Sequence, residues 1–176
     1  MTLLALLSTP LAYRKLQAEV DAYYAAKGNA DADGIISYGD AKSLKYVQAA
    51  IREGLRMWPP SVGLFSKLVP ESGDTLHGLY LPPGTEIGQS VYGIGRSTKT
   101  WGPDADIYRP ERWLEASPDK FAEMTTACDF VFSSGKYLCL GKPVAFMEMS
   151  KVFVEVRADI SAFFARVPAV LKLTFG

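Results

Sequence analysis

The chain has 176 residues, of which 48% are hydrophobic and 12% aromatic, so it can form one ordinary hydrophobic core. Nineteen lysine and arginine residues balance nineteen aspartate and glutamate residues without any basic run, which argues against nucleic acid as a partner. Two cysteines and one histidine exclude a disulfide framework, and they cannot complete a four-ligand zinc site without carboxylates.

The first 28 residues contain a short apolar segment and a predicted helix. Met1–Leu7 is apolar, but it is too short to cross a membrane and lacks the basic leader of a signal peptide. We expect it to form the last turns of a buried helix whose beginning is missing. Thr9 and Pro10 predict the start of the next helix, and Gly28 predicts its end. The residues of that helix that recur at helical spacing are Leu16, Val20, Tyr23 and Tyr24.

A second predicted helix follows a polar loop at 29–34. It runs from about Asp40 to Met57, and Pro59 and Pro60 end it. Its apolar face is most simply a core face, and this face consists of Leu44, Val47, Ile51 and Leu55.

Beyond Ser61 the chain changes character. Residues 62–69 and 86–92 predict short strands joined by turns rich in glycine and proline. His77 lies in a polar turn region between them, which is typical of a surface residue. Residues 94–119 are rich in glycine, proline and aromatic side chains, and we expect an irregular but packed meander there.

The segment after Pro143 predicts a long helix that is apolar almost all round. Its polar positions form one narrow stripe, which is typical of a mostly buried helix: Glu148, Lys151, Glu155 and Asp159. No internal repeat or low-complexity tract occurs. The elements together predict one domain over residues 1–176, mainly α with a small β-sheet region.

The most informative segment is 132–141, Phe-Ser-Ser-Gly-Lys-Tyr-Leu-Cys-Leu-Gly. It places Cys139 in a turn between Gly135 and Gly141, just before the long helix. Glycine lets the backbone adopt a positive φ or pass close to a flat ligand. A cysteine taken alone is more often a small buried hydrophobe than a ligand. In this setting, however, its thiolate is suited to bind haem iron.

The pattern F-x-x-G-x-x-x-C-x-G in this segment resembles the haem-binding loop of the cytochrome P450 family. Residues 53–56 (Glu-Gly-Leu-Arg) are similar to the family's E-x-x-R motif, and residues 108–113 (Tyr-Arg-Pro-Glu-Arg-Trp) to its P-E-R-F/W segment. Residues 81–85 (Leu-Pro-Pro-Gly-Thr) stand where the family often has a similar turn. The resemblance covers about 1–156 and corresponds to the C-terminal portion of the cytochrome P450 fold, whereas 157–176 diverge.

The resemblance implies a set of cofactor-binding residues. Cys139 is the expected axial ligand of the haem iron, with Phe132 packed near the thiolate and Gly135 and Gly141 letting the loop approach the haem. Tyr137 stands where the family normally has an arginine that pairs with a haem propionate, and a phenol brings no charge.

Further roles follow from the same resemblance. Lys67, and less strongly Arg96, occupy positions at which family members place propionate contacts, although ordinary surface charge is the alternative for both. Lys136 lies in the loop that faces an acidic redox partner in the family. The structural triad expected behind the haem loop consists of Glu53, Arg56 and Arg112, which are fold-keepers and not catalysts.

The resemblance implies a haem-thiolate monooxygenase, or the C-terminal fragment of one. Such an enzyme takes electrons from a reductase and inserts one oxygen atom of O2 into an organic, apolar substrate. The parent is expected to be a fungal microsomal protein, anchored in the endoplasmic reticulum membrane by a segment that this chain lacks. The competing hypothesis is a non-catalytic truncated remnant that cannot hold haem independently. The loops that select the substrate are mostly missing, so the substrate is not predicted.

Overall fold

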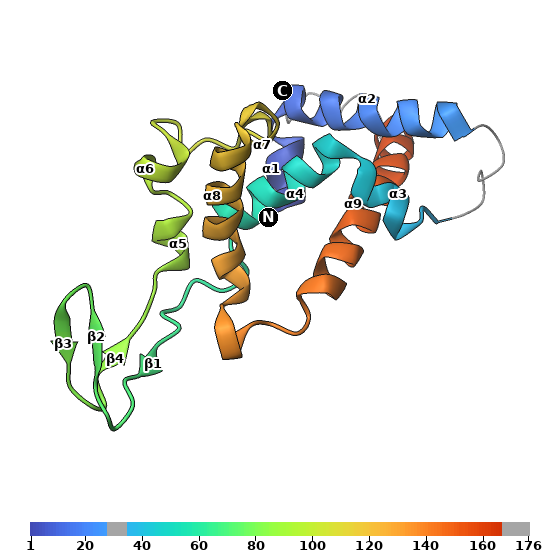
Figure 1. Ribbon diagram of the computed structural model, residues 1–176. Helices are drawn as coiled ribbons and strands as arrows, with labels where there is room; N and C mark the ends of the chain where they lie inside the picture. The colour runs from blue at the N-terminus through green and yellow to red at the C-terminus, as the bar shows by residue number, and fades with distance from the viewer. Residues whose placement is uncertain (28–34, 167–176) are drawn as a thin grey trace.

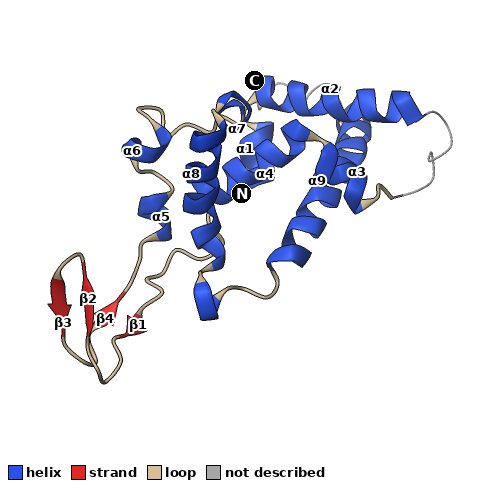
Figure 2. Ribbon diagram, in the orientation of Figure 1, coloured by secondary structure: helices blue, strands red, loops and turns tan. Residues whose placement is uncertain are grey.

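The computed structural model describes residues 1–27 and 35–166, with side chains described up to residue 156. Most described residues are helical, and the few strands are short (Figure 2), which confirms a mainly α fold with a small β-sheet region. The elements, in chain order, are α1 (Thr2–Leu7), α2 (Pro10–Lys27), α3 (Tyr38–Ser43), α4 (Lys45–Met57), β1 (Lys67–Leu68), β2 (Asp74–Leu76), β3 (Leu79–Leu81), β4 (Glu86–Ile87), α5 (Val91–Ile94), α6 (Thr98–Trp101), α7 (Glu111–Glu115), α8 (Pro118–Asp129) and α9 (Lys142–Arg166).

Helix α4 is the centre of the core. It contacts α1, α2, α3, α7, α8 and α9, and ten of its thirteen residues are buried. The strands lie at one end of the molecule, far from α2 (Figure 1). The segment that carries Cys139 joins the C-terminus of α8 to the N-terminus of α9 (Figure 1). The largest fully buried aliphatic side chains of the core are Leu16, Val20, Val47, Ile51 and Val154.

The two N-terminal predictions have different outcomes. The helix expected between Thr9 and Gly28 is α2, with Leu16 and Val20 on its buried face. Helix α1 was expected to be buried, but only its Leu6 is buried. Helix α1 instead crosses α4 so closely that a Cβ on Gly54 would overlap the side chain of Thr2. The predicted loop at 29–34 lies outside the described residues.

The helix predicted from Asp40 to Met57 is two helices, α3 and α4. Leu44 breaks it with an extended ψ of 100°. The cause is tertiary, because the Glu19 carboxylate of α2 accepts hydrogen bonds from the backbone N–H groups of Tyr46 (2.9 Å) and Val47 (3.0 Å). An acidic group at this position satisfies free donors at the N-terminus of α4 and favours starting a new helix there.

The predicted strands are shorter than expected. Within the predicted ranges 62–69 and 86–92, the paired residues are Lys67–Leu68 and Glu86–Ile87, which run antiparallel, and Val91–Ile94 is a helical turn instead of strand. A second hairpin, β2–β3, was missed. It turns at His77 and Gly78 with φ of +50° and +81°, the left-handed pair that a two-residue hairpin turn requires. His77 is exposed, which confirms its prediction as a surface residue.

The expected meander at 94–119 is partly helical, since it contains α6, α7 and the start of α8. Helix α8 begins with a cap, because Ser117 accepts a hydrogen bond from the Lys120 backbone and Pro118 occupies the first turn. The predicted irregular segment therefore carries ordinary helix-start signals.

Helix α9 is less buried than predicted. Between residues 142 and 156, buried residues are confined to Ser150, Phe153 and Val154, whereas Val144 is 51% and Val152 is 44% exposed. The physical reason is that α3 and α4 cover one side of α9 and leave its other apolar side open. Within the described parts of the chain, no helix is both long and apolar enough to cross a bilayer.

Candidate functional site

The three residues predicted as a triad lie together in the core. Glu53 on α4 and Arg112 on α7 join through Glu53 Oε1 and Arg112 Nε at 2.9 Å. Arg56, one helical turn after Glu53, meets the same carboxylate with two parallel bonds, Nε to Oε2 at 2.9 Å and Nη2 to Oε1 at 2.7 Å. Their exposures are 0%, 5% and 2% for Glu53, Arg112 and Arg56. Buried charges of this kind are stable only when they are paired and hydrogen-bonded.

Each N–H donor of both guanidinium groups has a hydrogen-bond acceptor. The remaining donors of Arg56 bind backbone carbonyls from the segment between α5 and α7, those of Gly95 (2.6 Å), Ala105 (2.5 Å) and Ile107 (3.1 Å). Arg112 donates in the same way to carbonyls of the same segment and to the carboxylate of Asp104 at 3.1 Å. The two arginines therefore fix the irregular 95–107 segment to α4.

Two further groups complete the carboxylate's shell. The backbone N–H of Arg109 donates to Glu53 Oε1 at 3.0 Å, and the indole N–H of Trp113 donates to Oε2 at 3.0 Å. Glu53 thus accepts five hydrogen bonds. This role of Trp113 was not predicted from the sequence. The signal was present, since a tryptophan next to the triad arginine needs an acceptor once it is buried.

The segment that carries Cys139 is a loop closed by backbone contacts. The N–H of Cys139 donates to the carbonyl of Phe132 at 2.8 Å, and the N–H of Lys142 donates to the carbonyl of Cys139 at 3.3 Å. Gly135 has the predicted positive φ, +58°, and no atom lies within 4 Å of where a Cβ would be. Cys139 itself is exposed at the surface of this loop.

Gly141 differs from Gly135. Its φ is not positive, and its carbonyl accepts the N–H of Ala145 as the first turn of α9 forms. A Cβ at Gly141 would lie 3.6 Å from Cys139 Sγ. Of the two roles predicted for this glycine, the positive φ does not occur, and the close approach of the backbone to a flat ligand stays a prediction.

Phe132 anchors the loop to the core. It is 9% exposed, and its ring centroid lies 5.6 Å from that of Phe146 on α9. An ion pair between Asp129 and Lys142, 2.7 Å long, joins the end of α8 to the start of α9 across the loop. Side chains on both flanks of the loop therefore hold its ends together, while Cys139 stays accessible.

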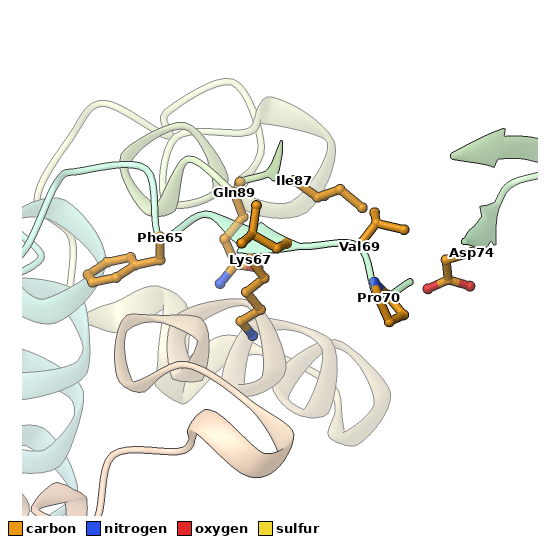
Figure 3. Close-up of a pocket in the computed structure, with 9 residues that line it drawn as sticks. Phe65, Lys67, Val69, Pro70, Asp74, Ile87 and Gln89 are labelled. Atoms are coloured by element: carbon orange, nitrogen blue, oxygen red, sulfur yellow. The ribbon is translucent and has the colours of Figure 1, made fainter. Parts of the chain in front are cut away.

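Tyr137 lies between two lysines. Lys67 Nζ is 4.5 Å and Lys136 Nζ 5.0 Å from the centroid of its half-exposed ring, distances at which a cation is attracted to a π face. Lys67 also lines a hollow of about 270 Å³ beside the β1–β4 pair, with its side chain directed away from Asp74 (Figure 3). The structure thus places the ammonium groups of Lys67 and Lys136 beside the Tyr137 ring.

Arg96 is engaged elsewhere. Its Nη2 donates to the carbonyl of Met57 at 2.8 Å, its Nε lies 3.4 Å from Asp106 Oδ1, and its guanidinium stacks on Tyr92 at 3.7 Å. Its buried Nη1 has no hydrogen-bond partner among the described residues. None of these contacts joins Arg96 to the loop of Cys139.

The second cysteine has a different environment. Cys128 on α8 is buried, and its Sγ donates to the carbonyl of Arg52 at 3.6 Å. Burial raises the pKa of the Cys128 thiol from its ordinary 9.0 to about 12. Cys128 is therefore a packing residue, and Cys139 is the thiol that an external group can reach.

Comparison with known proteins identifies the family to which this arrangement belongs. The family model described as Cytochrome P450 matches residues 1–156. The chain belongs to the cytochrome P450 family. The match ends where the sequence analysis placed the limit of the resemblance, at residue 156.

Relatives in this family are fungal monooxygenases. Cytochrome P450 monooxygenase ABA1 of Pyricularia oryzae is 43% identical over 155 residues, which are 88% of this chain and 30% of that protein. Cytochrome P450 monooxygenase aba1 of Botryotinia fuckeliana is 40% identical, with the same shares covered. Cytochrome P450 monooxygenase abl1 of Leptosphaeria maculans is 41% identical over 157 residues, 87% of this chain and 26% of that protein. The chain therefore spans less than a third of the length of these relatives.

Proposed function

We propose that this chain is the haem-binding, C-terminal part of a fungal haem-thiolate monooxygenase, with Cys139 as the axial ligand of the iron. The observation that carries the proposal is the placement of Cys139. It is exposed on a loop whose backbone is fixed by its own N–H and by a left-handed Gly135, in a chain of the cytochrome P450 family. A fixed, accessible thiolate is what an iron ligand requires.

The residues around Cys139 fit a haem. Leu138 and Leu140 flank the sulfur with exposed apolar side chains, suited to a flat apolar ring. Lys67 and Lys136 form no ion pair within the described chain and lie beside the loop, where they can meet carboxylates. When bound, the haem supplies reductive O2 chemistry, in which two electrons and two protons accompany insertion of one oxygen atom into a substrate and release of the other as water.

The protein's own residues then have separate tasks. Cys139 supplies the thiolate, which pushes electron density onto the iron. Phe132 and the Asp129–Lys142 pair hold the loop ends together, and the backbone hydrogen bond from Cys139 to Phe132 fixes the position of the cysteine. Glu53, with its two arginines, keeps the 95–107 segment against α4, which supports the proposed role as fold-keeper and not catalyst.

A specific observation favours the second hypothesis, a chain that cannot hold haem by itself. Leu140 is 95% exposed, and several other apolar side chains are open to solvent in the same half of the molecule, namely Leu138, Val144, Met147 and Val152. Exposed apolar surface of this extent is typical of a face that other residues cover, and this chain matches only 30% of the ABA1 monooxygenase. For the whole protein we propose monooxygenase activity on an apolar organic substrate, electron supply from a reductase that reaches Lys136, and a location at the endoplasmic reticulum membrane.

The test is a carbon monoxide difference spectrum of the full 176-residue chain, supplied with haem and reduced with dithionite. We expect the strongly red-shifted Soret band of thiolate ligation in the wild-type chain. Cys139→Ala should abolish this band, whereas Cys128→Ala, the same change at the buried cysteine, should keep it. A band typical of neutral ligation, or a red-shifted band that survives Cys139→Ala, contradicts the assignment of Cys139. Absence of haem uptake supports the second hypothesis.

A further inference from the structure

A groove on the surface of the helical body has neither Cys139 nor any other residue of its loop among the residues that line it. Its volume is about 370 Å³, and α3 and α4 form one wall while α7 and α8 form the other. This volume lies within the range of small-molecule sites. The groove is lined by Lys42, Lys45, Gln48, Ala49, Arg52, Trp113, Leu114 and Phe121.

The residues that line the groove carry positive charge and no negative charge, and the carboxylate of Asp129 lines a neighbouring hollow and pairs with Lys142. The lining includes three cations, Lys42, Lys45 and Arg52, and no carboxylate. In the described part of the chain none of the three belongs to an ion pair, whereas Lys15 and Lys120 on other surfaces are paired with glutamates. Lys42 and Lys45 are exposed at the rim. The groove therefore has a positive potential that an anion would neutralise.

Arg52 is the fixed cation of the groove. Its guanidinium carbon lies 5.7 Å from the ring centroids of Trp113, Phe121 and Phe146, which surround it. Such stacking restricts a long side chain before any ligand arrives, so less entropy is lost on binding. No hydrogen-bond acceptor within the described residues meets its guanidinium donors, although a guanidinium is suited to bind a carboxylate with two parallel bonds.

The opposite wall is apolar. Leu114 is 47% and Phe121 is 38% exposed, and the buried Trp113 lies behind them. Gln48 completes the polar side, and its amide is held by hydrogen bonds to the Ala41 carbonyl and the Ser150 hydroxyl. Ligand sites usually combine an apolar wall with a few polar groups that are fixed in position.

We propose that this groove binds a small organic anion with an apolar, planar body. Its carboxylate would pair with the Arg52 guanidinium, near the Lys45 ammonium, and its body would lie against Leu114 and Phe121. Binding at this groove requires neither haem nor Cys139, so the proposal stands or falls separately from the proposed function.

The experiment compares two probes of the same shape, 2-naphthoate and the neutral 2-naphthalenemethanol. Each is titrated into the full chain without haem, with binding followed by saturation-transfer NMR and equilibrium dialysis. We expect 2-naphthoate to bind at least about tenfold more tightly, the usual gain from a charge-assisted bond, and to weaken as salt increases. Equal affinity of the two probes would overturn the proposal.

Variants locate the site. Arg52→Gln should weaken 2-naphthoate by about tenfold and leave the alcohol unchanged. Lys99→Gln, which removes an exposed lysine from another surface, should change neither affinity. Because Arg52 also packs against core rings, Leu114→Glu serves as a second variant. It places a carboxylate at the groove without removing a buried contact, and it should block the anion. If both groove variants bind 2-naphthoate like the wild type, the anion does not bind here.

Discussion

The glutamate–arginine cluster and the loop of Cys139 are opposite kinds of site. In the cluster, Glu53 and its two arginines are at most 5% exposed, and the chain itself supplies hydrogen-bond partners for both guanidinium groups. In the loop, Tyr137, Leu138, Cys139 and Leu140 are all exposed. All charged groups of the cluster are paired within the described chain, whereas these side chains of the loop are exposed and can contact a ligand.

This difference separates stability from function. A buried charge must find its partners within the fold, because leaving it unpaired costs several kcal/mol. An exposed loop contributes little to the free energy of unfolding, so its side chains are available to bind a ligand. Substitutions in the cluster should therefore change unfolding, and substitutions in the loop should change ligand binding.

The largest effect is expected for Glu53→Gln. The variant leaves the buried Arg56 without a carboxylate partner and leaves Arg112 with Asp104 alone, so we expect it to lower the free energy of unfolding by about 3–5 kcal/mol. Urea denaturation followed by circular dichroism measures this change, and complete loss of cooperative unfolding would agree with it. Glu123→Gln is the matched control, since Glu123 pairs with Lys120 on the exposed side of α8. Equal behaviour of the two variants would show that the cluster does not stabilise the fold.

The second prediction compares the two thiols. A maleimide at neutral pH should modify Cys139 readily in the native chain and leave Cys128 unmodified. Burial raises the pKa of Cys128 to about 12, so its thiolate fraction falls at least about a hundredfold below that of an unburied thiol. Mass spectrometry of the labelled chain gives the ratio, and both thiols should react in denaturant. Rapid native labelling of Cys128 would mean that α8 opens easily.

Local signals predicted the cluster only in part. The spacing of Glu53 and Arg56 places them on one helical face, so their pairing follows from sequence alone. The participation of Arg112, 59 residues from Glu53, came only from the resemblance to the family. The carbonyls that saturate both arginines lie in an irregular segment, and no periodic pattern predicts where such groups point.

The helix boundaries show a second limit. The apolar face of α4 was correctly predicted, but the break at Leu44 depends on the carboxylate of Glu19, 27 residues before Tyr46 in the chain. By contrast, the start of α8 at Ser117 and Pro118 was not predicted but could have been, because a hydroxyl residue followed by proline is the same helix-start signal as Thr9 and Pro10. The burial of α9 was overestimated. An apolar pattern predicts that a helix face will be covered, but it does not predict which residues cover it.

The third prediction concerns acid at the edge of the cluster. Burial acts to raise the pKa of Asp104, but hydrogen bonds from Arg112 and Arg109 outweigh it and hold the pKa below its ordinary 3.8. A carboxyl whose pKa is lowered by folding stabilises the fold above its unfolded pKa, and loses this contribution as pH falls through the folded value. Asp104→Asn should therefore lower Tm at pH 7, and the difference from wild type should shrink below about pH 4. The control Glu148→Gln, at an exposed position of α9, should show no such pH-dependent difference.

The smallest effect is expected at the ion pair that closes the loop. Asp129 and Lys142 are 33% and 28% exposed, and pairs of this exposure contribute about 1 kcal/mol or less to stability. Asp129→Asn should therefore change the free energy of unfolding slightly, and the double variant Asp129→Lys with Lys142→Asp should restore it. The more informative measurement is the maleimide rate at Cys139 in these variants. If the backbone contact between Cys139 and Phe132 fixes the loop, the rate stays unchanged. A marked change in the rate would show that side chains outside the core hold the cysteine, and the loop would then depend on charge as the cluster does.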